Sequence, residues 1–172
     1  MTHIDCHIGD ITRIAADAIV NAANEALLPG GGVCGAIHAA AGPRLAAACR
    51  DLGRCPTGSA VVTPGFDLPA RHVIHAVGPR WHGGDRGEPA LLRACYAAVF
   101  ELCRSHGFGS VALPAISTGI FRYPLAAATE IAVAAAREAA ARPGRLETIL
   151  FCCFSEEVAQ SYRALLGASG GS

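Results

Sequence analysis

The residues best suited to chemistry lie between positions 21 and 38, where two asparagines precede a run of three glycines. Glycine lets a backbone approach a ligand closely, and the free amide N–H groups at a helix start attract anions. We therefore expect the glycine loop to bind phosphate, with the side chains of Asn21 and Asn24 directed into the same site. The alternative is that both asparagines only satisfy the backbone of their loop, as asparagines often do in turns.

Two further segments carry polar groups directly after predicted strands. Residues 114–121 include Ser117, Thr118 and Gly119, and small residues at such a place expose consecutive amide N–H groups that bind anions. Phe121 ends this loop and either stacks on a sugar or base or belongs to the core. Asp10 follows the first predicted strand, where its carboxylate either accepts a hydrogen bond from an amine such as that of adenine or caps a turn.

The remaining candidates do not predict a metal or a cofactor. His38 follows Cys34 by one helical turn, so the two side chains share a helix face, but a single histidine there is more often structural. His72 and His75 alternate along a predicted strand and point to opposite faces, so they cannot form a metal-binding pair. The glycines do not complete the dinucleotide-binding fingerprint, and no Ser-His-Asp order or His-Glu-x-x-His motif occurs.

Alternating strands and helices must position these loops. Runs rich in β-branched residues predict strands at 3–8, 17–22, 59–63, 72–77, 110–113 and 148–154. Helical patterns cover 35–50 with a bend near Pro43, 89–106, 124–141 from Pro124 as first residue, and 155–166 with Ser155 as cap. This alternation predicts an α/β sandwich with a mostly parallel sheet. Because ligands bind beyond the carboxyl ends of such strands, we expect the loops after residues 22 and 113 to meet.

Size and composition fit one domain at residues 1–166 with a flexible tail at 167–172. Hydrophobic residues make up 52% and charged residues 16%, as in a globular protein, and fourteen basic residues balance fourteen acidic ones. Nucleic acid is therefore not indicated as a partner. The eight cysteines match no zinc module, and neither a signal peptide nor a membrane-spanning run is found. We expect a cytoplasmic monomer with unpaired thiols and no membrane association.

Taken together, these segments resemble macrodomains of the MacroD type, which bind ADP-ribose. The resemblance covers nearly the whole chain from Gly9. It is carried, in this order, by Gly9-Asp10-Ile11-Thr12, by the strand and loop at 17–24, by the loop at 30–38, by Ala41-Gly42-Pro43, by Ile74-His75-Ala76-Val77-Gly78-Pro79 and by Ser117-Thr118-Gly119-Ile120-Phe121. The family resemblance implies a three-layer α/β/α sandwich around a mixed sheet of about six strands.

The same resemblance implies roles for individual residues. Asp10 would bind the adenine amine with help from the Ile11 amide, and Asn24 would contact the distal ribose beside Phe121. The pyrophosphate would lie between two backbone segments, Gly31, Gly32 and Val33 on one side and Ser117, Thr118, Gly119, Ile120 and Phe121 on the other. Family members cleave O-acetyl-ADP-ribose or remove ADP-ribose from acidic side chains of proteins. The expected partners are therefore ADP-ribose, O-acetyl-ADP-ribose and ADP-ribosylated proteins.

The chain departs from the MacroD pattern at two positions. Cys34 stands where the family has an aspartate that positions or activates water, so Asn24 and Cys34 occupy the catalytic positions. A neutral thiol is a weaker hydrogen-bonding group than a carboxylate. Arg122 replaces a glycine before Tyr123-Pro124, and its guanidinium either reaches a phosphate or lies in solvent.

Three functional hypotheses follow from Cys34. The first is an ADP-ribosyl ester hydrolase with reduced turnover, in which substrate phosphate helps to position water. The second is a reader that binds ADP-ribose or ADP-ribosylated proteins without cleaving them. The third makes Cys34 a nucleophile at a helix N-terminus, where the helix lowers the thiol pKa but a bound diphosphate opposes that effect.

Overall fold

The computed structural model describes residues 1–169, and a six-stranded sheet runs through the middle of this part of the chain. Its strands are β1 (His3–Ile8), β2 (Ala18–Ala22), β3 (Ala60–Pro64), β4 (His72–Ala76), β5 (Ser110–Leu113) and β6 (Thr148–Cys153). Their order across the sheet is β1-β6-β5-β2-β4-β3, and all neighbours are parallel except β3, which pairs antiparallel with β4. The predicted mixed, mostly parallel sheet is confirmed.

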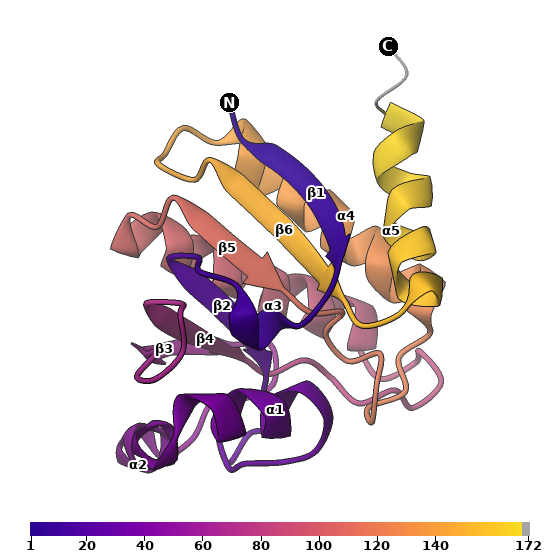
Figure 1. The fold of residues 1–172 in the computed structure, drawn as a ribbon. Coiled ribbons are helices and arrows are strands. Elements are labelled where there is room, and N and C mark those ends of the chain that lie inside the picture. Colours follow the sequence, from indigo (N-terminus) through magenta and orange to yellow (C-terminus); the bar gives the residue numbers. More distant parts are fainter. Residues whose placement is uncertain (170–172) are drawn as a thin grey trace.

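Helices cover both faces of this sheet (Figure 1). They are α1 (Gly32–Ala41), α2 (Pro43–Leu52), α3 (Glu88–His106), α4 (Leu125–Ala141) and α5 (Glu156–Ser169), with a short 3₁₀ helix at Ile11–Arg13. Residues of α3, α4 and α5 share one buried cluster, which includes Tyr96, Phe151 and Tyr162. Those of α1 and α2 share another with Ile37 and Leu45. The three-layer α/β/α sandwich is thereby confirmed, because apolar side chains leave the sheet on both sides.

One predicted helix is wrong in its bounds. The segment expected as a single bent helix at 35–50 forms two helices, because Gly42 takes a φ of 84°, which interrupts the helical path before Pro43. In addition, α1 begins at Gly32, three residues earlier than expected. Val33 and Cys34 therefore belong to the first turn of a helix.

The other helix ends agree with the sequence to within a few residues. Ser155 caps α5, since its Oγ accepts a hydrogen bond from the Val158 amide at 3.4 Å. Pro124 directly precedes α4 instead of being its first residue. Of the tail predicted at 167–172, residues 167–169 continue α5, and 170–172 lie outside the described residues.

All eight cysteines are free thiols, and seven of them are buried.

A buried polar network connects β2, β3 and β4 beneath α1 and α2. His75 is fully buried, and its Nδ1 lies 3.0 Å from Asn21 Nδ2. Its Nε2 lies 2.9 Å from the Thr63 hydroxyl. Burial lowers the pKa of His75 to about 4, and the neighbouring His38 ring adds to the effect. His75 is therefore a neutral structural histidine, and His72 contacts Phe108 in the other cluster.

This network predicts a pH-dependent stability. Between pH 7 and 5 an unfolded histidine with a pKa near 6.5 binds a proton that the folded His75, with a pKa of about 4, does not bind. The free energy of unfolding should therefore fall by about 2 kcal/mol on going from pH 7 to pH 5. Urea denaturation at the two pH values measures it. In His75→Gln, which cannot titrate, most of this difference should disappear, and an unchanged difference would contradict the assignment.

Candidate functional site

A cleft of about 770 Å³ lies beyond the carboxyl ends of the parallel strands. Its volume falls in the range of small-molecule sites. The residues to which the family resemblance gives ligand or catalytic roles all line this cleft: Asp10, Ile11, Asn24, Gly31, Gly32, Val33, Cys34, Ser117, Thr118, Gly119, Ile120 and Phe121. These residues come from three loops, after β1, β2 and β5, because parallel strands place those loops at the same edge of the sheet.

The loop after β2 supplies the N-terminus of α1. No hydrogen bond of the described residues involves the amide N–H groups of residues 31–34, whereas Gly35 donates to the Gly31 carbonyl at 3.4 Å. Unsatisfied amides at a helix start carry partial positive charge and bind anions. Gly32 has a φ of 58°, which a residue with a side chain adopts only with strain. The glycine there turns the backbone into the helix and leaves its amides facing the cleft.

The loop after β5 forms the opposite wall. Ser117 accepts a hydrogen bond from Tyr123 at 2.8 Å, and Gly119 accepts one from Arg122 at 3.0 Å, so the loop folds back on itself. Within residues 1–169, the amide N–H groups of Ser117, Gly119, Ile120 and Phe121 have no protein acceptor. Successive free amides in a tight turn form an anion-binding concavity.

The Ser117 side chain is also available to a ligand. Its Oγ is buried and has no hydrogen-bond partner among the described residues. A buried hydroxyl without a partner costs stability, so it is usually explained by a ligand or water. Ser117 has a φ of 69°, and the backbone of Gly78 packs against its hydroxyl so closely that a Cβ at Gly78 would collide with it. The glycine at 78 therefore fixes the position of Ser117.

The two glycine-containing loops face each other across the cleft. A Cβ at Gly31 would lie 3.3 Å from Ile120 Cδ1, so the side chain of Ile120 reaches across to the other loop. Ile120 is 68% exposed, which is unusual for an isoleucine, and it lies over the opening between the two sets of amides. This convergence was the condition on which the sequence-based hypothesis depended, and the structure satisfies it.

Asn24 and Cys34 meet at one backbone carbonyl. Asn24 Nδ2 donates to Leu28 O at 2.8 Å, and the Cys34 thiol points to the same oxygen at 3.8 Å. Asn24 Oδ1 accepts from the Leu28 amide at 3.0 Å, so Asn24 does satisfy its own loop, as one alternative held. Because Asn24 also lines the cleft, its second amide hydrogen remains free for a ligand.

Asp10 caps the 3₁₀ helix and lines the cleft at the same time. Its Oδ1 accepts from the Thr12 hydroxyl at 2.6 Å and from the Thr12 amide at 2.9 Å. These two bonds, hydroxyl first, lower the pKa of the Asp10 carboxyl, with a smaller contribution from the charge of Arg13. The carboxylate therefore stays ionised and can accept a hydrogen bond from a ligand amine.

The structure adds cleft residues that the sequence analysis did not single out. Gly78 and Arg80 come from the segment after β4, and Cys152 and Phe154 from the end of β6. The guanidinium of Arg80 lies over the Phe121 ring, 4.6 Å from its centre, and Phe154 is 80% exposed at the cleft margin. The only signal for Phe154 was an aromatic residue at a strand end, which is typical of core residues as well.

Three residues that the sequence analysis considered do not line the cleft. The expectation that Asn21 points into the site with Asn24 is wrong, because Asn21 is buried and its side-chain amide lies against His75. Arg122 is exposed, and of its two proposed positions the solvent-facing one is observed. Its φ of 63° is a left-handed conformation that favours glycine, the residue implied there by the family resemblance. His38 contacts His75, with 6.5 Å between ring centres, and belongs to the buried layer beneath the site.

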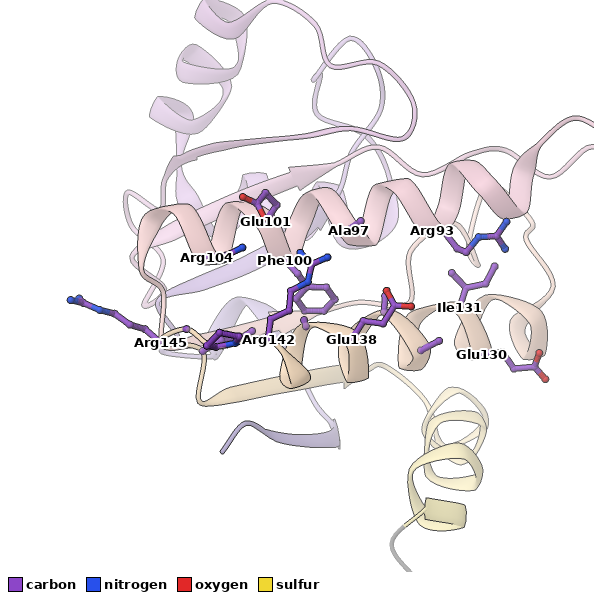
Figure 2. Close-up of a pocket in the computed structure, with 16 residues that line it drawn as sticks. Arg93, Ala97, Phe100, Glu101, Arg104, Glu130, Ile131, Glu138, Arg142 and Arg145 are labelled. Atoms are coloured by element: carbon purple, nitrogen blue, oxygen red, sulfur yellow. The ribbon is translucent and has the colours of Figure 1, made fainter.

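A surface hollow between α3 and α4, away from the cleft, differs from it in its lining. Figure 2 shows these helices side by side with Phe100 between them and charged side chains along the rim. The volume is about 310 Å³, and both charge signs are present, with Arg93, Arg104, Glu101 and Glu138 among the lining residues. None of the predicted site residues reaches it, so we assign the candidate site to the cleft at the strand ends. Within the described part of the chain no helix has the length and apolarity needed to cross a membrane.

Comparisons with known proteins agree in pointing to one family. The family model described as Macro domain matches residues 20–132. A macro domain-containing protein of Mesorhizobium japonicum is 51% identical over 98% of this chain and 96% of its own length. A protein of Klebsiella pneumoniae named O-acetyl-ADP-ribose deacetylase is 52% identical over 94% of both chains. Among solved structures, the Trypanosoma brucei macrodomain in complex with ADP-ribose has a TM-score of 0.91 at 40% identity, covering 96% of this chain and 69% of that one.

Proposed function

This chain belongs to the Macro domain family, and we propose that it binds ADP-ribose and hydrolyses esters at the distal ribose. The substrates we propose are O-acetyl-ADP-ribose and proteins that carry ADP-ribose on aspartate or glutamate. The relatives named O-acetyl-ADP-ribose deacetylase, at about half identity, support the first of these.

The observation that carries the proposal is the pair of facing loops with unpaired amides. The unpaired N–H groups at residues 31–34, at 117 and at 119–121 bind a diphosphate without lysine, and Arg80 is the one arginine among the described residues that line the cleft. In this proposal Asp10 accepts a hydrogen bond from the adenine amine, and Asn24 and Phe121 contact the distal ribose; all three line the cleft. Ester cleavage at this ribose consumes one water and yields a carboxylic acid and the free ribose hydroxyl.

The second candidate function is a reader without catalysis, and the geometry of Cys34 favours it. The thiol points to the Leu28 carbonyl, which makes it a hydrogen-bond donor and not a base for water. In the hydrolase, the substrate phosphate and Asn24 must therefore hold the attacking water. The loss of a general base typically lowers a rate by about 10²–10⁴-fold, which slows turnover without abolishing it.

Calorimetry with ADP-ribose and a turnover assay with O-acetyl-ADP-ribose test the proposal together. We expect saturable binding at one site per chain and slow release of acetate above the uncatalysed rate. If the chain binds ADP-ribose but releases neither acetate from O-acetyl-ADP-ribose nor ADP-ribose from a glutamate ester, it is a reader and not a hydrolase. Absence of binding would reject both.

A further inference from the structure

A second cavity opens from the Asn24 end of the cleft. It has a volume of about 640 Å³ and shares four lining residues with the cleft: Asn24, Gly78, Arg80 and Phe121. Asp10 is not among its lining residues. With adenine beside Asp10, a substituent on the distal ribose therefore leads into this second cavity, and the ADP part of the ligand does not.

The walls of this cavity combine apolar and polar residues. Leu28, Pro29 and Leu91 are among the apolar ones, and Thr57, His82 and Arg86 are among the polar ones. An aliphatic and peptide-like occupant fits such a lining better than a sugar or a base would. The cavity is also much larger than an acetyl group requires.

Both carboxylates of this cavity are ionised, but their oxygens are already engaged by other groups of the protein. Glu25 accepts from the Thr57 amide at 3.1 Å and lies 3.6 Å from Arg54. Glu88 is buried and accepts from the amides of His82 and Gly84 at 2.9 Å each and of Arg86 at 2.6 Å. Burial would raise the pKa of Glu88, but these amides outweigh it and hold the pKa at about 2. Neither carboxylate is therefore free to pair with an arginine of the cavity.

The guanidinium groups of the same cavity have no such partners. Among residues 1–169, neither Arg80 nor Arg86 forms an ion pair, and Arg80 only stacks on Phe121. Asp85 lies in the same loop but does not line the cavity. The cavity thus holds two guanidinium groups without an ion-pair partner, beside carboxylates that are engaged elsewhere, and these guanidinium groups suit an anionic occupant.

We propose that the second cavity binds the protein segment to which ADP-ribose is esterified, and that Arg80 and Arg86 favour acidic residues beside the modified glutamate or aspartate. The proposal rests on the proposed function, because the ADP-ribose part must occupy the main cleft. It defines the substrate class of this site as ADP-ribosylated acidic segments, and O-acetyl-ADP-ribose as a small substrate that leaves the second cavity unused.

Binding measurements with non-hydrolysable conjugates test this without depending on catalysis. Two peptides carry ADP-ribose through a stable linkage, one flanked by glutamates and the other by glutamines, and free ADP-ribose is the reference. We expect the glutamate peptide to bind about threefold to tenfold more tightly than the glutamine peptide, as for a solvent-accessible charge contact. The preference should weaken as salt is raised.

Arg86→Gln is the informative variant, because the Arg86 backbone amide still binds Glu88 and only the side chain changes. It should remove most of the preference for the glutamate peptide and leave the affinity for ADP-ribose within about twofold. Arg50→Gln, on the exposed side of α2, is the matched control and should retain the preference.

The outcomes separate this inference from the proposed function. If free ADP-ribose does not bind, both fail. If ADP-ribose binds but the two peptides bind equally, or if Arg86→Gln weakens all three ligands alike, the second cavity does not select acidic segments. Tighter binding of ADP-ribose extended by a further nucleotide than of the glutamate peptide would assign the cavity to a polymer and would also overturn the inference.

Discussion

Cys34→Asp is expected to raise the rate constant for ester hydrolysis by about 10²-fold or more, within the range that a general base supplies. The thiol now donates toward the Leu28 carbonyl at 3.8 Å. A carboxylate cannot donate there, and two oxygen acceptors repel each other, so the new side chain turns toward the cleft and accepts from water or from Asn24. Single-turnover hydrolysis of an ADP-ribosylated glutamate substrate measures the change.

Two controls isolate the cause. Cys34→Asn has nearly the same shape as the aspartate but no charge, so it should leave the rate near that of the wild type. ADP-ribose affinity should change little in either variant, because the amides at 31–34 belong to the backbone. An unchanged rate in Cys34→Asp would show that substrate and Asn24 already position the water, and the reduced-activity hypothesis would be wrong.

Gly78→Ala is expected to weaken ADP-ribose binding by at least about tenfold, the equivalent of one lost hydrogen bond to a charged group. The added methyl would lie 2.6 Å from Ile116 Cγ2 and closer still to Ser117 Oγ, and both residues are buried. The loop must therefore move, and with it the amides that face the diphosphate. We also expect a loss of about 1–3 kcal/mol in the free energy of unfolding, as for other overpacked sites.

Gly144→Ala is a suitable comparison, since a Cβ there meets nothing within 4 Å. It should retain both the affinity, measured by calorimetry, and the melting temperature. If Gly78→Ala binds ADP-ribose as tightly as the wild type while only its stability falls, the Ser117 loop does not hold the diphosphate. Another segment of the cleft would then have to bind the diphosphate.

Much of the fold could be predicted from the sequence because its signals are local. All six strands are found near their predicted positions, since each is a short β-branched run bounded by turn residues. The break between α1 and α2 was missed because Gly42 and Pro43 are also compatible with a bend, and only the φ of 84° separates the two cases. Twelve of the residues that line the cleft could be named because they lie in loops after strands or in the first turn of a helix.

The second cavity and the role of Gly78 had no such signal. Thr57, Arg80, Arg86 and Leu91 stand in separate segments with no shared period, and only the packing of the loop after β4 against Asn24 brings them together. The sequence analysis assigned no role to Glu88. Its three amide partners appear only when the loop before α3 is folded around it.

The sequence by itself determined the alternation of strands and helices, the two glycine-containing loops and the presence of a thiol at position 34. These are properties of neighbouring residues, whose backbone preferences act over a few positions. Only the tertiary structure decided that the loops face each other, that the Cys34 thiol points to a carbonyl and that a cavity with two unpaired guanidinium groups continues the cleft. Such features depend on contacts between distant segments, and packing, not local preference, fixes their distances.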